Sequence, residues 1–434
     1  VGPLDEIGVI VVQVGGELDE AREGGERDGR RAGEGEGGVG GKRVRPGIRH
    51  NGFNSARRDK YEMNEAISAA GLPAAKQALC RSAVEAEFEA ATKFGCRDYD
   101  DDDDDDDSDD DAPGTVPVII KPPRGVASDR VRLCRDLSQV RNAVDDILSC
   151  VVFGRHDERH SGALLQEYIP GTEYAVDVCS RDGVHKVAAV WAYERISTAD
   201  DGTSDPFAYR SSTLVSYDDD ERHPTGAICD YVESCLDALD IKWGLTHTEV
   251  KVFTTTTTTP TPPHQDNDGE EEVVNVRLME VNVRQQNDNF VPLCQMCIGY
   301  NALDMWLSAL LDDDNDEEEE EVKTSLFDAI PRRPHLVRSG SVVSLVCYAD
   351  GTLTGINHLD EIHNLESVVH VQVYPQFAEP GNAVERSRDI RTDAGYIHLV
   401  NDDENVLRKD YDTICEYMYT MFEVEEVEEE KKKK

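Results

Sequence analysis

Acidic, amide and basic side chains alternate with apolar ones over residues 273–284, which read VVNVRLMEVNVR. Successive side chains of an extended strand point to opposite faces, so a strand here would place Glu280, Asn282 and Arg284 on one face. Carboxylate and amide oxygens are ligands that Mg²⁺ prefers, and arginine presents a planar fork of donors to a phosphate or carboxylate. The segment therefore predicts one side of a site for a metal ion and an oxyanion.

A second polar strand is predicted over residues 245–253, where His247, Glu249 and Lys251 would share a face. If the two segments pair as a hairpin, Glu249 would lie about 5 Å from the acidic and amide groups of the first strand. Two carboxylates and an amide oxygen would then converge on Mg²⁺, or on Mn²⁺ in the same role. A solvent-facing polar strand without a function explains the pattern about equally well.

A candidate phosphate-binding loop begins at Lys121, which follows the apolar run 116–120 and precedes the sequence PPRGVAS. A lysine at a strand end, followed by small residues with free backbone N–H groups, can hold phosphate oxygens. The loop is not a P-loop, because no Gly-Lys-Ser or Gly-Lys-Thr ends it. A surface lysine before a tight turn is the alternative interpretation.

Residues 166–173 (QEYIPGTE) form a candidate nucleotide-binding segment. The backbone of residues 166–169 could read the edge of an adenine ring through its N–H and C=O groups, and Glu173 could accept hydrogen bonds from ribose hydroxyls. A strand end followed by a turn accounts for the same residues without a ligand.

The apolar pattern predicts helices and antiparallel hairpins in mixed order, which is typical of an α+β domain. Predicted helices cover residues 54–70, 73–91, 137–152, 229–239, 303–311 and 403–422. Predicted strands cover residues 116–120, 163–168, 173–179, 184–193, 245–253, 273–284 and 342–348, and a strand, a helix and a strand follow the turn at 350–351. The Asp182-Gly183 turn indicates a hairpin. A Thr-rich and acidic loop of nineteen residues would join the two polar strands.

The chain of 434 residues carries 45 basic and 89 acidic residues, a net charge of −44. Three runs at 98–111, 266–272 and 312–321 hold 26 of the acids, so the rest of the chain has a net charge of −18. We interpret the runs as solvated insertions between elements, and residues 15–50, rich in Gly, Arg and Glu, as disordered. We expect no nucleic-acid partner, because so acidic a chain repels phosphates.

The remaining composition indicates a soluble protein of a reducing compartment, and we expect a cytoplasmic location. Eleven cysteines are scattered singly except for Cys294 and Cys297, which we interpret as part of a packed helix. No apolar stretch approaches the ~20 residues of a membrane span. The apolar run 7–14 follows two acidic residues rather than a basic leader, so we expect neither membrane association nor a signal peptide. The sequence begins at Val1, and whether residues precede it stays open.

The order of these segments resembles that of the ATP-grasp superfamily. Residues 165–177 (LQEYIPGTEYAVD) are similar to its carboxylate–amine ligase branch, of the L-amino-acid ligase and carnosine synthase type. The segments that carry the resemblance are Asp59-Lys60, VIIK at 118–121, QEYI at 166–169 with Glu173, then Glu249, and EVNVR at 280–284. The resemblance covers residues 54–422 and implies an ATP-grasp fold, in which two α+β subdomains clasp the nucleotide.

The resemblance also implies roles for individual residues. The residues that would bind ATP are Lys60, Lys121 and Ser128 at the phosphates, Gln166, Glu167, Tyr168 and Ile169 around the adenine, and Glu173 at the ribose. The residues that would hold two Mg²⁺ ions are Glu249, Glu280 and Asn282, and those that would act on the transferred phosphoryl group or acyl phosphate are Arg284 and Lys121.

The sequence departs from the family pattern in three places. Gly125 is the only glycine of the phosphate loop, the residues after Arg284 are QQND where glycines often follow, and the N-terminal α/β domain is nearly absent, with residues 7–14 as its one remaining strand. The expected division is a remnant N-terminal segment (1–53), a helical linker and acidic loop (54–115), a nucleotide-binding subdomain (116–195), a metal- and phosphate-binding subdomain (196–311), an acidic loop (312–322) and a C-terminal lid or substrate subdomain (323–434).

These expectations combine into an ATP-dependent ligase that joins a small-molecule carboxylate to an amine through an acyl phosphate. Amino acids or similar small metabolites are the expected substrates, and a homodimer is left open. One alternative keeps the fold but changes the chemistry to a carboxylase-like or purine-pathway reaction. Another is a non-catalytic acidic scaffold that binds basic partners.

Overall fold

The computed structural model describes residues 50–98, 116–152, 155, 157–196, 198, 207–218, 222–258, 270–311 and 325–425. The chain divides into two compact units, residues 1–50 and 51–434, and all described helices and strands belong to the second. The strand expected at 7–14, the disorder expected over 15–49 and most of the acidic runs lie outside the described residues. No helix within the described ranges is long and apolar enough to cross a membrane.

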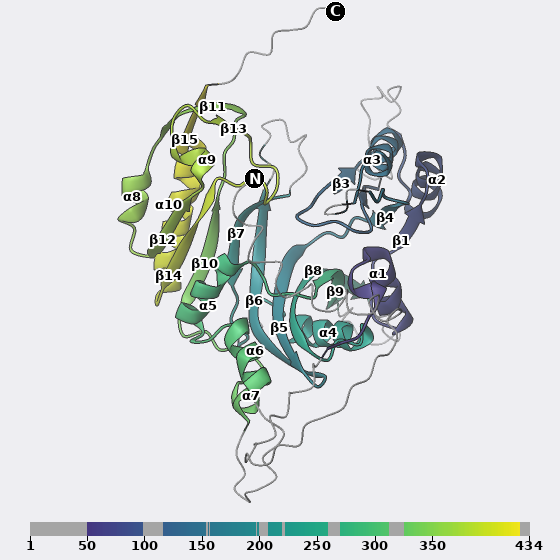
Figure 1. The fold of residues 1–434 in the computed structure, drawn as a ribbon, viewed down its shortest axis with the longest axis horizontal. Coiled ribbons are helices and arrows are strands. Elements are labelled where there is room, and N and C mark those ends of the chain that lie inside the picture. Colours follow the sequence, from purple (N-terminus) through teal and green to yellow (C-terminus); the bar gives the residue numbers. More distant parts are fainter. Residues whose placement is uncertain are drawn as a thin grey trace, which may run out of the picture. The chain divides into compact units, whose positions relative to one another are not determined.

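An antiparallel sheet of eight strands forms the larger part of the second unit (Figure 1). Its strands lie in the order β12 (Val368–Val373), β14 (Gly395–Asn401), β10 (Ser339–Leu345), β7 (Ala208–Leu214), β6 (Val184–Ile196), β5 (Thr172–Arg181), β8 (Gly244–Thr258) and β9 (Glu270–Asn282). The predicted hairpin of β5 and β6 is confirmed, and Asp182 and Gly183 in its turn have φ values of 51° and 80°. Positive φ at both central residues suits a tight turn between twisted strands.

Helices cover both faces of this sheet around β5 and β8. Those on one face are α1 (Lys60–Ala69) and α4 (Thr225–Ala238), and those on the other are α5 (Val291–Cys297) and α6 (Ala302–Leu311). Val176 is buried in the core beneath α4, whereas Ala175 is buried with Trp191 beneath α5. Because side chains alternate along β5, Glu173 and Asp177 project to the same side as Ala175.

A smaller antiparallel sheet carries the predicted nucleotide-binding segment. Its strands lie in the order β1 (Gln77–Cys80), β4 (Ala163–Glu167), β2 (Val118–Lys121) and β3 (Arg132–Cys134). α2 (Ala83–Glu89) and α3 (Leu137–Ser149) pack together and share an apolar core with the strands, in which Val118, Ile120 and Val144 are buried. In Figure 1 this sheet and its helices lie together as a group, connected to β5 through the segment after β4.

The helix expected over residues 73–91 is wrong in its first half. Residues 77–80 form β1, which pairs with β4 along its whole length. α2 begins only after Ser82, whose hydroxyl accepts a hydrogen bond from Glu85 N (3.2 Å), while Glu85 Oε2 accepts one from Arg81 N (2.7 Å). This reciprocal capping marks a helix start. The capping signal was present in the sequence, but the pairing of β1 with a strand over eighty residues away was not.

The C-terminal part extends the large sheet through β10, β14 and β12 and adds a three-stranded sheet. The order in that sheet is β13 (Ala383–Val384), β11 (Gly351–Ile356) and β15 (Phe422–Glu425), and α10 (Glu404–Met421) packs on β10 and β14. The remaining short helices are η3 (Ser55–Arg57), η4 (Ala90–Phe94), η5 (Asp288–Phe290), α7 (Leu326–Ala329), α8 (Leu359–His363) and α9 (Pro375–Ala378).

The other predicted elements are confirmed with shifted ends. One predicted loop is shorter than expected, and five further strands were not predicted, namely β3, β7, β13, β14 and β15. β8 and β9 remain paired out to Thr258 and Glu270, so eight of the nineteen residues that were predicted to form a loop are strand. Threonine is β-branched and fits a strand well, which explains why the Thr-rich run continues the ladder.

Candidate functional site

The two polar strands pair antiparallel, as the sequence predicts. Glu249 in β8 stands directly opposite Glu280 in β9, and His247 stands opposite Asn282. Directly opposed residues of an antiparallel pair have Cβ atoms about 5 Å apart. The structure therefore brings two carboxylates and one amide group together on neighbouring strands.

A β-bulge at Met279 decides which side chain stands opposite Glu249. The register shifts by one residue between the pair Glu249–Glu280 and the pair Val250–Leu278, which leaves Met279 as the extra residue. A bulge re-aims the side chains that follow it. Leu278 is buried in the core beneath α4, and an unbroken ladder would turn Glu280 toward that core. The bulge instead places Glu280 on the polar face.

Lys60, in the first long helix, contacts both β9 and the phosphate loop. It is the first residue of α1, where Asp59 caps the helix by accepting hydrogen bonds from Tyr61 N and Glu62 N. Its Nζ donates to Glu280 Oε1 (2.8 Å) and to Gly125 O (2.9 Å). The ammonium group therefore contacts the carboxylate that was predicted to bind Mg²⁺.

Lys121 ends β2 and is 5% exposed. Its pKa is lowered to about 8, chiefly by burial and then by the charge of Lys60, while Glu280, Glu249 and Glu173 oppose the shift. The ammonium group of Lys121 therefore interacts electrostatically with Lys60 and with these three carboxylates. The sequence prediction that Lys121 and the two strands contribute to one site agrees with this arrangement.

His247 is buried between two carboxylates. Its Nδ1 lies 2.8 Å from Asp177 Oδ1, and its Nε2 lies 3.4 Å from Glu249 Oε1. Burial by itself lowers the pKa of His247, but the hydrogen bonds to Asp177 and Glu249 raise it overall. Burial raises the pKa of Glu249, but His247, Arg195 and Lys60 lower it overall, so Glu249 stays ionised at neutral pH. The alternation of the sequence predicted the face of His247, but no pattern in the sequence indicated a role for it.

Glu173 is held by two basic residues that the sequence analysis did not connect with it. Arg195 Nη2 donates to Glu173 Oε1 (2.5 Å) and Arg195 Nε to Oε2 (3.1 Å), and Lys251 Nζ lies 3.7 Å from Oε2. Glu173 is 7% exposed. A ribose hydroxyl would therefore have to share a carboxylate oxygen with Arg195 or Lys251. Lys251 shares a face of β8 with Glu249, as the alternation of the sequence predicts. No local pattern in the sequence indicates that Arg195 contacts Glu173.

The adenine candidates lie where the small sheet passes into the large one. Gln166 and Glu167 belong to β4, where Gln166 Nε2 donates to Gln77 Oε1 (3.2 Å) and Glu167 Oε1 accepts from Lys76 N (2.8 Å). Tyr168 is 40% exposed and Ile169 is buried. These two residues lie between β4 and β5, in the short connecting segment whose backbone was predicted to read adenine.

The phosphate loop after β2 adopts an unusual backbone for its composition. Ala127, Ser128 and Arg130 all have positive φ, at 53°, 56° and 54°. Only glycine enters this region without strain, so the loop stores strain where relatives were expected to have glycine. Ion pairs hold the loop on two sides: Asp129 Oδ1 lies 2.8 Å from Arg391 Nη1, and Arg130 Nη1 lies 2.6 Å from Asp146 Oδ2.

Arg284 follows the end of β9 by two residues and is exposed. Its Nη1 donates to Gln285 O (2.7 Å), which is a contact with its own chain neighbour. The guanidinium group is thus accessible to a phosphate or carboxylate near the carboxylate pair. This placement is compatible with the predicted role of Arg284.

The donor set fits a divalent cation that keeps other ligands. No cluster of three or more His, Cys, Asp or Glu side chains that could hold a metal occurs among the described residues. Glu249, Glu280 and Asn282 supply two carboxylates and one amide oxygen, too few for an all-protein site. Mg²⁺ usually retains water and takes phosphate oxygens as further ligands. Glu280 already binds a cationic group, the ammonium group of Lys60.

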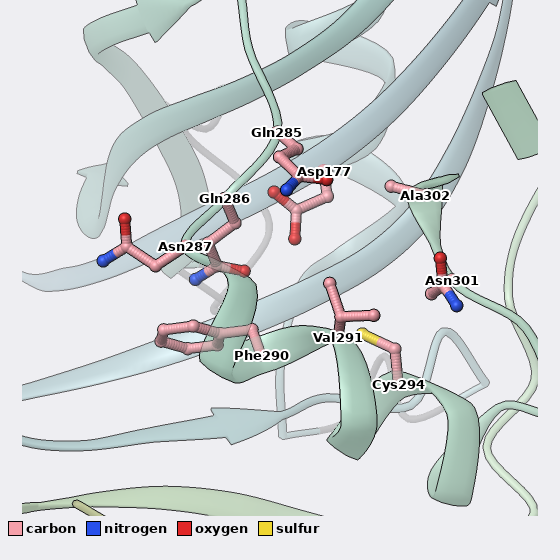
Figure 2. A pocket seen from close by; sticks show the side chains of 9 residues that line it. All are labelled: Asp177, Gln285, Gln286, Asn287, Phe290, Val291, Cys294, Asn301 and Ala302. Carbon is pink, nitrogen blue, oxygen red and sulfur yellow. The ribbon is translucent and has the colours of Figure 1, made fainter. Parts of the chain in front are cut away.

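A pocket lies beside this cluster, at the start of α5 (Figure 2). Its lining residues are Asp177, Gln285, Gln286, Asn287, Phe290, Val291, Cys294, Asn301 and Ala302. Gln286 Nε2 donates to the hydroxyl of Tyr193 (3.1 Å), which lies 3.4 Å from His247 Nε2. The pocket is therefore connected to the carboxylate pair by a short chain of hydrogen-bonding groups. Nothing in the sequence pattern singled it out.

Comparison with known proteins identifies the fold. Residues 114–261 match the ATP-grasp domain family. An uncharacterized protein, y4rH of Sinorhizobium fredii, is 23% identical over 286 residues, which are 66% of this chain and 49% of that protein. The chain thus spans about half the length of this curated relative.

Two solved structures share the fold at low identity. An L-amino acid ligase from Bacillus licheniformis has a TM-score of 0.54 and 16% identity, over 86% of this chain and 73% of that one. An N5-carboxyaminoimidazole synthase from Aspergillus clavatus in complex with ADP has a TM-score of 0.51 and 11% identity, over 84% of this chain and 74% of that one. The fold is an ATP-grasp fold of the α+β class.

Proposed function

We propose that the protein is an ATP-dependent carboxylate–amine ligase that forms an amide or peptide bond through an acyl phosphate. The observation that carries the proposal is the register of β8 and β9, which sets Glu249 opposite Glu280. The interaction of Lys60 and Lys121 with the same carboxylates supports it. An ATP-grasp domain matched over residues 114–261 agrees with nucleotide binding.

The first step of the proposed reaction transfers a phosphoryl group. A carboxylate oxygen of the substrate attacks the γ-phosphorus of ATP, and the bond from that phosphorus to the β–γ bridging oxygen breaks, which releases ADP. Lys60 and Lys121 would neutralise the charge on the phosphate oxygens, and Arg284 would orient the transferred group. When bound by Glu249, Glu280 and Asn282, Mg²⁺ would supply further charge neutralisation at the phosphates.

The second step forms the amide. The amine nitrogen attacks the acyl carbon, the carbon–oxygen bond to the phosphate breaks, and inorganic phosphate leaves as the ammonium proton is lost. Water must be excluded, because it would hydrolyse the acyl phosphate. We propose that the phosphate loop, in which Asp129 pairs with Arg391, covers the phosphates and helps to exclude water.

Small amino acids are the substrates that we propose first. The fold shared with an L-amino acid ligase supports this choice. The test is an assay of phosphate release with ATP, Mg²⁺ and pairs of amino acids, with product identified by mass. If no acid–amine pair releases phosphate from the folded chain, the proposal fails.

The shared fold of the carboxyaminoimidazole synthase favours a second candidate, in which bicarbonate replaces the organic carboxylate. ATP turnover that depends on bicarbonate and needs no amine would support this candidate and contradict the first. ATP binding without turnover under either condition would leave the non-catalytic alternative.

We also propose a reducing compartment such as the cytoplasm as the place of function. All eleven cysteines are free thiols in the structure. Free buried thiols are typical of proteins kept away from oxidising conditions.

A further inference from the structure

α6 (Ala302–Leu311) carries leucines on the side that faces away from the protein. Its other side packs on β5, β6 and β8, where Met305 and Ala309 are fully buried. Residues three or four apart share a side of a helix, so four leucines line up opposite these buried residues. We call them the leucine face; they are 42% to 61% exposed, and they are Leu303, Leu307, Leu310 and Leu311.

α7 adds a further exposed leucine beside this face. α6 and α7 pack together (Figure 1), and Phe327 of α7 is buried in the same apolar cluster as Met305 and Ala309. Leu326, at the start of α7, is 55% exposed. The apolar surface at this end of the molecule is therefore formed by two helices that anchor each other.

The polar groups of α6 do not make the leucine face favourable in water. Asp304 and Ser308 are the only residues of the helix that are neither aliphatic nor aromatic. Asp304 Oδ2 accepts hydrogen bonds from Asn301 N (3.1 Å) and Asn301 Nδ2 (2.7 Å), and Ser308 Oγ donates to Asp304 O (2.8 Å). A surface helix usually carries charged residues opposite its buried side, and a helix that is apolar all round is usually covered. Exposed apolar patches of this kind are typical of interaction sites.

The sequence next to the leucine face indicates the charge of what covers it. Leu311 is followed directly by residues 312–321 (DDDNDEEEEE), nine of which are acidic. The segment with this run connects α6 to α7, so both of its ends lie beside the leucine face. A second copy of the chain would bring a second acidic run and a further net charge of −44, and an anionic membrane surface would be repelled as well. A partner with basic groups beside an apolar surface is instead attracted.

We infer that the leucine face binds a basic amphipathic helix of a partner protein. The apolar side of that helix would pack on Leu303, Leu307 and Leu310, and its lysines or arginines would lie toward the acidic run. Leucines at this spacing suit the packing of one helix against another, which is a recurrent mode of peptide recognition. The interaction uses none of the residues assigned to the nucleotide or the metal, so it does not depend on the ligase reaction.

Two labelled peptides test the inference on the full chain at about 0.15 M salt. Both contain the same numbers of leucine and lysine; in one all leucines lie on one side of a helix, and in the other their order is scrambled. In fluorescence anisotropy, the natural chain should bind the amphipathic peptide about tenfold or more tightly than the scrambled one. The double variant Leu303→Ser with Leu307→Ser should lose about tenfold in affinity for the amphipathic peptide and less than about twofold for the scrambled one.

A matched control lies on α2. Val84 and Phe88 are 66% and 64% exposed and are also four residues apart on a helix. The double variant Val84→Ser with Phe88→Ser should bind both peptides as the natural chain does. The charge is tested separately by changing the nine acids of 312–321 to asparagine or glutamine. This variant should bind the amphipathic peptide about tenfold more weakly at 0.05 M salt, and the difference should shrink at 0.5 M, where the charges are screened.

The inference is overturned if the natural chain binds both peptides equally, or if the two serines on α6 leave binding of the amphipathic peptide unchanged. A dimer in sedimentation velocity that the same two serines dissociate would assign the leucine face to a second copy and overturn it as well. Leu307→Lys guards against a folding defect in the double variant. Its thermal midpoint should match that of the natural chain while its affinity for the amphipathic peptide falls about tenfold, and an unchanged affinity would contradict the inference.

Discussion

At the scale of single residues, the site depends on charges held close together away from water. Lys60, Lys121 and His247 supply positive or donor groups, and Glu249 and Glu280 supply negative ones. Each buried charge is stabilised by its neighbours rather than by solvent, so removal of one member leaves the others unpaired. Single substitutions are therefore expected to change function strongly where the substituted group meets the nucleotide or metal.

Glu280→Gln is expected to reduce ATP turnover about 100-fold or more, because it removes a negative ligand and a partner of Lys60. The thermal midpoint should fall little, since Glu280 is only partly buried and Gln has nearly the same shape. The measurements are phosphate release as a function of Mg²⁺ and a thermal melt. Glu272→Gln, an exposed change on the same strand, is the control. Unchanged turnover in Glu280→Gln would exclude the ligand role.

Lys121→Ala is expected to raise the KM for ATP, and the natural chain should show a related pH dependence. The pKa of Lys121 is lowered to about 8, so its ammonium group is charged below pH 8 and loses its proton as the pH rises through 8. ATP affinity should fall above pH 8 in the natural chain. Lys121→Arg should keep its charge and a flat profile. A KM that is the same in Lys121→Ala as in the natural chain would place Lys121 outside the site.

At the scale of elements, backbone conformation decides how the two sheets are connected. The segment between β4 and β5 contains Gly171, which has a φ of 95°, and a Cβ there would meet Val252 O at 2.1 Å. Only glycine allows β8 to approach this closely. The segment that contains the adenine candidates can therefore lie against β8 only because residue 171 is a glycine.

Gly171→Ala is expected to destabilise the fold by more than about 2 kcal/mol, because it adds a backbone clash to the strain of a positive φ. Chemical denaturation measures the change. Gly52→Ala is the matched control, since Gly52 also has a positive φ of 70° but no atom within 4 Å of the added Cβ. It should cost only about 1 kcal/mol. Equal losses in the two variants would show that the contact with β8 is not close.

At the scale of the whole molecule, the acidic runs contribute most of the net charge, and two of the three occupy positions between elements. The third, at 266–272, was also expected between elements, but its residues 270–272 belong to β9 and pair with β8. The run at 98–111 separates η4 from β2, and the run at 312–321 separates α6 from α7. Neither contains a residue that the sequence predicted for the candidate site. Their expected effect is on solubility and on long-range repulsion of anions such as ATP.

Deletion of residues 99–111 is expected to leave the ATP dissociation constant unchanged within about twofold at 0.15 M salt, where charges beyond ~8 Å are screened. Asp98 is retained, because its Oδ1 accepts a hydrogen bond from Leu137 N (3.1 Å) at the start of α3. Calorimetric titration with ATP and Mg²⁺ is the measurement. Loss of ATP binding would assign the run a role in the site, and loss of a basic protein partner alone would favour the scaffold alternative.

The sequence by itself determined the elements that repeat a local pattern. Alternation predicted the shared polar face of residues 247–251 and that of residues 280–284, the Asp182-Gly183 turn predicted the β5–β6 hairpin, and the order of short motifs indicated the ATP-grasp fold. These features depend on neighbours within a few residues, so the chain records them directly.

The tertiary structure decided what depends on residues far apart in the chain. It alone shows the bulge at Met279, the strand β1, the hydrogen bonds of Arg195 to Glu173, the burial of His247 against Asp177, and the pocket at Gln286. Hydrogen bonds across a sheet and the burial of a charge have no signature in a single segment, because the partner comes from another strand.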